Sequence, residues 1–190
     1  MKFDYENLIV DKIFNDDEIA KIYSHINNAP EDKSRVVDNL GQKAYFVWLP
    51  EDIVDVIVKR ANEISDVPVE LRELSFATYI KDNHPRLHPH LDTVFFEPRL
   101  TLDIQVGGNI SWPISVEGRE YTIENNQALT FSGTHQIHWR PKIDFKDGEH
   151  LDMIFCHFSE VGATPNTLGD DHYLPLDLRC VKLLKEYNES

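Results

Sequence analysis

The chain has few cysteines and no long hydrophobic run. Its two cysteines, Cys156 and Cys180, do not form a Cys-x-x-Cys pair, so neither a zinc knuckle nor a disulfide framework is predicted. The longest apolar stretches, such as residues 53–58, are much shorter than the roughly 18 residues that a membrane-spanning helix needs. The first residues also lack the apolar core of a signal peptide. We therefore expect a cytoplasmic protein that does not bind membranes.

Basic residues are also scarce, with 19 Lys and Arg against 33 Asp and Glu and a formal net charge of −14. Proteins that bind nucleic acid neutralise phosphates with clustered basic side chains, and this sequence has no such cluster. Nucleic acid is therefore not an expected partner. A length of 190 residues suits one domain with a sizeable core, and 41% apolar residues are typical of a globular protein.

The first 73 residues combine helix and strand patterns. Asp16 and Asp17 can cap a helix in which apolar residues recur at helical spacing up to about residue 26. A second helix is predicted to begin at Pro50, and residues 44–48 between the two helices form a predicted strand. Near the end of the chain, a helix over residues 176–187 is expected to pack four apolar side chains against the sheet: Leu178, Val181, Leu183 and Leu184.

From residue 74 the pattern changes to short β-rich runs separated by turn residues. The runs cover residues 74–81, 100–106, 110–116, 120–123, 128–131, 136–140 and 151–158. Many short strands at this spacing are typical of a β-sandwich or barrel. We predict one mainly β domain over residues 1–190. It would have a helix-and-strand buttress (1–73), a β core (74–160), and a loop with a closing helix (161–190).

The histidines supply the strongest functional signal. Five of the nine lie in two short clusters: His84, His88, His90, His135 and His138. Side chains alternate along a strand, so His90 and Asp92 share one face, and His138 can join them across the sandwich. Two imidazoles and a carboxylate on one side of a metal form the facial triad of non-haem Fe(II) oxygenases, which leaves the other positions open. We predict His90, Asp92 and His138 as metal ligands, and expect His135 to face the other way.

The order of these features resembles the 2-oxoglutarate/Fe(II)-dependent dioxygenase superfamily, especially its compact prolyl-4-hydroxylase-like branch. The resemblance covers about residues 74–158 and rests on Tyr79, His90-Leu91-Asp92, and Ser132-Gly133 ahead of His138. It implies a double-stranded β-helix core, also called a jelly-roll or cupin-like core. It further implies Fe(II), 2-oxoglutarate and O2 as cofactor and co-substrates, with the Tyr79 hydroxyl donating to a carboxylate of 2-oxoglutarate.

The sequence departs from the family pattern at the anchor for the distal carboxylate of 2-oxoglutarate. Most members have an Arg or Lys about ten residues after the distal histidine, where it pairs with that carboxylate. Here the corresponding region, residues 147–151, has no basic residue except His150. Arg140 lies two residues after His138 and so shares its strand face. We predict Arg140 as the anchor, with His150 as the second choice.

These features together predict an oxygenase that hydroxylates a small molecule, an amino acid or a peptide side chain and releases succinate and CO2. Asp92 favours hydroxylation, because halogenating relatives have a small residue at this position. Two alternatives stay open: a cupin-type metalloenzyme that does not use 2-oxoglutarate, and a non-catalytic jelly-roll binding module. The fold does not choose among substrates, and the sequence gives no oligomeric state.

Overall fold

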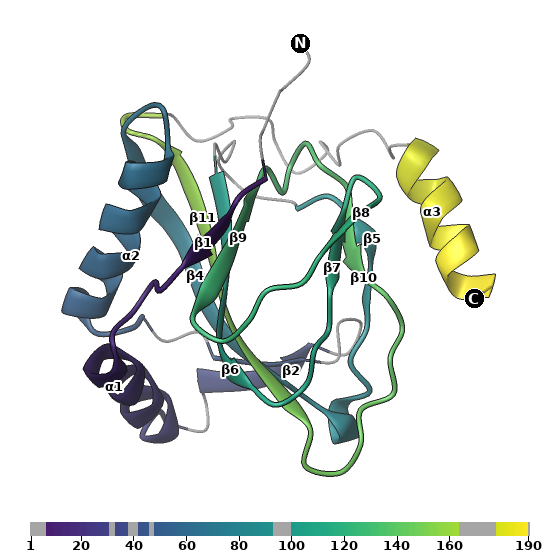
Figure 1. Cartoon of the computed structure of the whole chain (residues 1–190), viewed down its shortest axis with the longest axis horizontal. Helices are drawn as coiled ribbons and strands as arrows, with labels where there is room; N and C mark the ends of the chain where they lie inside the picture. Colours follow the sequence, from purple (N-terminus) through teal and green to yellow (C-terminus); the bar gives the residue numbers. More distant parts are fainter. Residues whose placement is uncertain are drawn as a thin grey trace.

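The computed structural model describes residues 7–30, 33–37, 42–45, 48–92, 100–163 and 178–189. Two antiparallel β-sheets face each other, with helices outside them (Figure 1). The larger sheet has seven strands in the order β1 (Ile9–Asp11), β9 (Gln127–Phe131), β6 (Leu100–Gly108), β11 (His150–Glu160), β4 (Val69–Ile80), β3 (Gln42–Tyr45) and β2 (Ser34–Val37). The smaller has four, in the order β5 (Leu87–His90), β10 (His138–Arg140), β7 (Ile114–Val116) and β8 (Arg119–Tyr121).

Four helical segments complete the described part of the chain: α1 (Asp16–Asn27), α2 (Glu51–Ile64), the 3₁₀ turn η2 (Lys81–Asn83) and α3 (Leu178–Glu189). Helices α1 and α2 cover the outer face of the seven-stranded sheet, and α3 lies beyond the four-stranded sheet (Figure 1). None of these helices is long and apolar enough to cross a membrane.

The seven-stranded sheet separates two hydrophobic cores, because successive side chains of each strand face opposite sides. The outer core, toward α1 and α2, includes Ile104 and Ile154. The inner core lies between the sheets and includes Leu129 and Met153. This division decides which polar side chains can reach the space between the two sheets, the interior of the barrel that they form.

Both predicted N-terminal helices form, but the predicted cap of the first is wrong. The N-cap is Asn15, whose side chain accepts the Glu18 N–H while the Glu18 carboxylate accepts the Asn15 N–H. Asp16 and Asp17 instead occupy the first turn, where negative charge is favourable beside the helix N-terminus. Helix α2 follows Pro50 as predicted, and its buried residues are Ile53, Ile57 and Ala61.

The predicted packing of α3 is wrong for two of its apolar side chains. Val181 and Leu184 are 44% and 37% exposed, whereas Tyr187 is buried. The ring of Tyr187 packs edge-on against His88 of β5, with 5.0 Å between centroids. The reason is position, because α3 meets the edge strand of the smaller sheet and turns its other sides away. The predicted start of this helix, residues 176–177, lies outside the described residues.

Several strand boundaries also differ from the prediction, and the differences are largest at two strands. β4 begins at Val69 rather than residue 74, because it pairs with β11 along nearly its whole length, from Val69 opposite Glu160 to Ile80 opposite His150. The predicted strand over residues 110–116 is confined to Ile114–Val116. Pro113 precedes it, and proline has no N–H to donate to a neighbouring strand.

Candidate metal centre and co-substrate pocket

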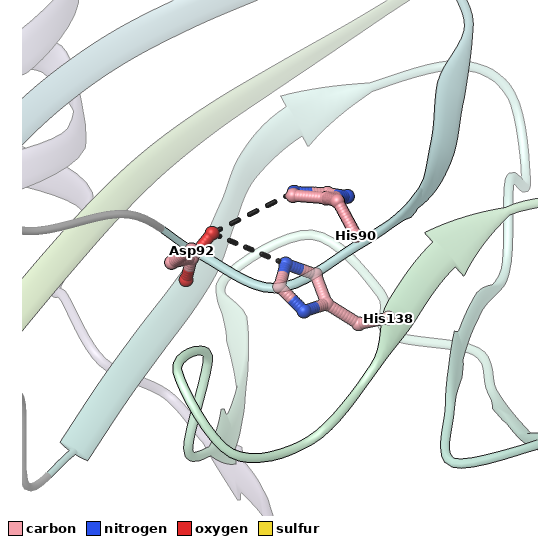
Figure 2. A group of neighbouring side chains, drawn as sticks. All are labelled: His90, Asp92 and His138. Carbon is pink, nitrogen blue, oxygen red and sulfur yellow. Dashed lines mark ion pairs between the residues drawn. The ribbon is translucent and has the colours of Figure 1, made fainter. Parts of the chain in front are cut away.

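The predicted metal ligands come together where the two sheets approach each other. His90 ends β5 and His138 begins β10, and the two residues are direct partners in the antiparallel pairing. Asp92 follows two residues after His90, and its backbone N–H donates to the Gly133 carbonyl at 2.8 Å. Both imidazoles and the carboxylate point toward one another (Figure 2). His90 and His138 lie far apart in the sequence and meet because β5 and β10 are neighbours.

The distances within this group suit one ion. Asp92 Oδ1 lies 3.4 Å from His138 Nε2 and 3.6 Å from His90 Nε2. One potential ligand atom from each residue lies within 4.8 Å of the others. Burial alone would raise the pKa of the Asp92 carboxyl, yet the imidazoles of His138, His157 and His90 hold it well below its usual range. Asp92 is therefore an ionised carboxylate, as a metal ligand must be.

Both imidazoles are oriented by backbone carbonyls. His90 Nδ1 lies 2.7 Å from the His88 carbonyl oxygen, and His138 Nδ1 lies 3.1 Å from the Gln136 carbonyl oxygen. A carbonyl only accepts, so each Nδ1 carries a hydrogen, and each Nε2 is the nitrogen that would bind a metal after releasing its own proton. This is the tautomer arrangement of metal-bound histidines. Two such nitrogens and one carboxylate oxygen are a donor set that fits Fe(II).

Gly133 allows the Asp92 carboxylate to reach this position. A Cβ atom at residue 133 would lie 1.7 Å from Asp92 Oδ2 and 2.9 Å from Thr101 Oγ1. The Gly133 N–H donates to Thr101 Oγ1 at 3.1 Å. The small residue before the distal histidine is thus required by close approach to a metal ligand.

We expect Gly133→Ala to weaken metal binding about tenfold or more, the range seen when an outer contact of a metal ligand is lost. The added methyl group must displace Asp92 from the imidazoles. Titration with Co(II) followed by visible absorption measures the change. Gly118→Ala is the control, because Gly118 has a φ of +81° and open space around it. Its methyl group strains the backbone but displaces no metal ligand, so the Co(II) affinity should not change. Equal affinity of Gly133→Ala and wild type would contradict this role.

Arg140 lies in the interior of the barrel, as its strand face predicts. Its side chain is fully buried, and Nη1 donates to the Trp112 carbonyl oxygen while Nη2 lies 3.9 Å from Met153 Sδ. Nε has no hydrogen-bond partner, and no carboxylate of the described residues forms an ion pair with this guanidinium. The buried Asp103 carboxyl attracts this guanidinium electrostatically but does not lie at ion-pair distance, and a buried cation without a directly contacting anion is costly. The geometry therefore leaves room for an anionic ligand at Arg140.

Tyr79 lies in the same interior. Its ring packs edge-on against Trp112, with 5.1 Å between centroids, and it is 1% exposed. Burial raises the pKa of its hydroxyl, which therefore stays protonated and can donate a hydrogen bond. Within the described ranges this hydroxyl has no hydrogen-bond partner, so it is available to a ligand.

The structure does not bring His150 into this pocket. His150 Nε2 lies 3.8 Å from Asp152 Oδ2, which also accepts from the Tyr23 hydroxyl of α1 at 2.9 Å. His150 thus belongs to the face of β11 that carries α1, opposite the inner core. His135 is not a ligand in this arrangement either, since its Nδ1 contacts Ser132 Oγ at 2.9 Å within the turn.

Three functional candidates were not predicted from the sequence: His157, Glu73 and Asp103. His157 of β11 places Nε2 3.2 Å from Asp92 Oδ2 and Nδ1 3.4 Å from Glu73 Oε2. Asp103 of β6 is 4% exposed. Alternation along the predicted strands holds a signal for Asp103, because Thr101, Asp103 and Gln105 are polar between apolar neighbours. No motif marks His157, which lies 65 residues from Asp92.

We expect Asp103→Asn to stabilise the metal-free protein above pH 6. Burial raises the pKa of the Asp103 carboxyl to about 6 from 3.8, only partly offset by His138. The folded state therefore holds this proton more tightly than the unfolded state, and ionisation costs the folded state about 3 kcal/mol once the pH exceeds 6. Below about pH 4 Asp103 is protonated in both states, so the advantage of the variant disappears.

Urea unfolding at pH 4 and pH 8 measures this difference between wild type and variant. Asp55→Asn, at an exposed position on α2, is the control and should show no such change with pH. The same stability difference for Asp103→Asn at both pH values would contradict the prediction.

Comparison with known proteins bears on the fold. No protein-family model matches the sequence, and no curated protein matches it. Solved structures do match. The non-haem α-ketoglutarate-dependent epimerase SnoN from nogalamycin biosynthesis has a TM-score of 0.68 and 12% identity, with 87% of this chain and 82% of that chain covered.

Two further structures show the same likeness. HygX from Streptomyces hygroscopicus, with nickel, 2-oxoglutarate and hygromycin B bound, has a TM-score of 0.64 and 8% identity, covering 84% of each chain. The viral collagen prolyl hydroxylase of Paramecium bursaria Chlorella virus-1, in complex with 2-oxoglutarate, has a TM-score of 0.58 and 11% identity, covering 83% of this chain and 97% of that one. The predicted resemblance is confirmed at the level of fold: this chain has the double-stranded β-helix fold of the 2-oxoglutarate/Fe(II) oxygenases, prolyl hydroxylases included.

Proposed function

We propose that the protein is a 2-oxoglutarate- and Fe(II)-dependent oxygenase in which His90, Asp92 and His138 hold the iron. The observation that carries the proposal is the convergence of these three side chains, with both Nε2 atoms presented to the carboxylate. Bound Fe(II) would supply the O2 chemistry that couples decarboxylation of 2-oxoglutarate to oxidation of a C–H bond. The protein's own groups bind, orient and exclude water.

The buried polar groups beside the metal centre support 2-oxoglutarate as co-substrate. The Arg140 guanidinium would pair with its distal carboxylate, since Arg forms strong charge-assisted hydrogen bonds to carboxylates. The protonated Tyr79 hydroxyl would donate to a carboxylate oxygen. Both lie in the inner core, where a low dielectric strengthens such contacts. Arg140 would thus take over the role that most relatives give to a residue further along the chain.

We propose hydroxylation of a small molecule, an amino acid or a peptide side chain as the reaction. Structural neighbours with hygromycin B bound, or named as a collagen prolyl hydroxylase, lend support to a small molecule and to a peptide side chain as substrate classes. Asp92 itself favours hydroxylation, because it occupies the coordination position that halogenation would need for chloride.

Succinate release tests the proposal. Purified protein is incubated with Fe(II), 2-oxoglutarate and O2, with and without a panel of amino acids, peptides and small metabolites. We expect succinate formation that requires all three additions and rises with a substrate. Oxygen uptake without 2-oxoglutarate would instead support a cupin-type enzyme. A protein that binds no metal would support a binding module, and either result would overturn the proposal.

A further inference from the structure

We propose that His157, backed by Glu73, positions Asp92 so that one carboxylate oxygen faces the metal and the other is held away. This inference rests on the proposed metal site and adds two positioning residues that no sequence motif marks. It concerns how the three ligands are oriented. Backbone carbonyls orient the two imidazoles, whereas a side chain orients the carboxylate.

The two oxygens of Asp92 have different surroundings. Oδ1 faces the imidazole Nε2 atoms at 3.4 and 3.6 Å. Oδ2 points the other way, toward His157 Nε2 at 3.2 Å and the bare backbone of Gly133. A carboxylate whose second oxygen accepts a hydrogen bond is held as a one-oxygen ligand. That arrangement preserves open coordination positions, which a bidentate carboxylate would reduce.

His157 is held in turn by the sheet. It lies directly opposite Glu73 on β4 and opposite Thr101 on β6. Its Nδ1 lies 3.4 Å from Glu73 Oε2, close enough for an ion pair, and Thr101 Oγ1 accepts the Gly133 N–H. One row of residues across three strands therefore converges on the side of Asp92 that faces away from the imidazoles.

The contrast with the histidine ligands makes this row testable. His90 and His138 are oriented by backbone carbonyls, which no side-chain substitution removes. Asp92 is the ligand that depends on a side-chain donor. Contacts of this kind typically contribute 10- to 100-fold to metal affinity. Glu73 is 57% exposed, so solvent screening should make its contribution smaller than that of His157.

Co(II) affinity and the Co(II) visible spectrum test the proposal without relying on turnover. We expect His157→Leu to weaken Co(II) binding 10- to 100-fold and to change the intensity of the visible bands, because Asp92 loses its donor and can bind through both oxygens. His157→Gln keeps an N–H donor and should stay within a few fold of wild type. Glu73→Gln should weaken binding two- to tenfold.

Controls separate this role from a structural one. His25→Gln on α1 and Glu63→Gln on α2 remove the same groups far from the site and should leave Co(II) binding unchanged. Melting of the metal-free protein reports folding, and if His157→Leu does not fold, Glu73→Gln decides by the same criterion. Wild-type affinity and spectra in His157→Leu, or in Glu73→Gln in that case, would overturn this inference alone. Failure of the wild type to bind Co(II) would overturn the metal site as well.

Discussion

Replacing Asp92 with alanine should abolish Fe(II)- and 2-oxoglutarate-dependent succinate release, with a fall of about 1,000-fold or more. The carboxylate is the sole anion among the three ligands, and its Oδ1 lies within 3.6 Å of both imidazoles. Its loss removes a ligand and leaves the centre with two neutral nitrogens. Metal affinity should fall by at least about 100-fold, since a ligand contributes more than the outer contacts that set the 10- to 100-fold range.

The matched control is Asp55→Ala, which removes an exposed carboxylate from α2. It should bind Fe(II) and turn over like the wild type. Equilibrium dialysis of Fe(II) under anaerobic conditions and succinate assays measure both quantities. Undiminished turnover by Asp92→Ala would reject the assigned ligand set.

Replacing Arg140 with methionine should raise the KM for 2-oxoglutarate about 100-fold while leaving Fe(II) affinity near wild type. A buried charge-assisted pair with a carboxylate is worth about 1.5–3 kcal/mol, and each 1.4 kcal/mol corresponds to a factor of ten. Arg140→Lys restores the charge but not the planar fork, so we expect it to recover part of the loss.

Arg140→Met should also raise the melting temperature of the protein without ligands. A fully buried guanidinium with an unpaired Nε, and with no described carboxylate at ion-pair distance, destabilises the fold. This pairing of results, weaker co-substrate binding with a more stable protein, distinguishes a binding residue from a structural one. Arg60→Met on α2 is the control and should change neither the KM nor the melting temperature in this way. An unchanged KM in Arg140→Met would place the distal carboxylate elsewhere.

Much of the metal centre was predictable because its signals are local. His90 and Asp92 are two residues apart and were predicted to share a strand face. They do come together, although β5 ends at His90 and the Gly133 carbonyl, not strand pairing, holds the Asp92 backbone. The same period carried Arg140 to the face of His138. Alternation also explains why His150 is not in the pocket. His150 and Asp152 are two residues apart on β11, so both side chains lie on its outer face.

The remaining features depend on pairing that the sequence does not display. His157 reaches Asp92 because β11 lies between β4 and β6, and no spacing in the sequence gives that strand order. The packing of α3 escaped prediction because its apolar residues recur at helical spacing whether or not a sheet covers them. The N-cap was misplaced by one residue, since Asn15, Asp16 and Asp17 are all capable caps.

Anaerobic addition of 2-oxoglutarate to the Fe(II) protein tests the central claim most directly. If His90, Asp92 and His138 hold Fe(II) with positions left open for a keto acid, a new visible absorption band should appear and saturate with 2-oxoglutarate. Glutarate, which lacks the keto group, should produce no band, and neither should the Asp92→Ala variant. Absence of the band in wild-type protein that has bound Fe(II) would contradict the account.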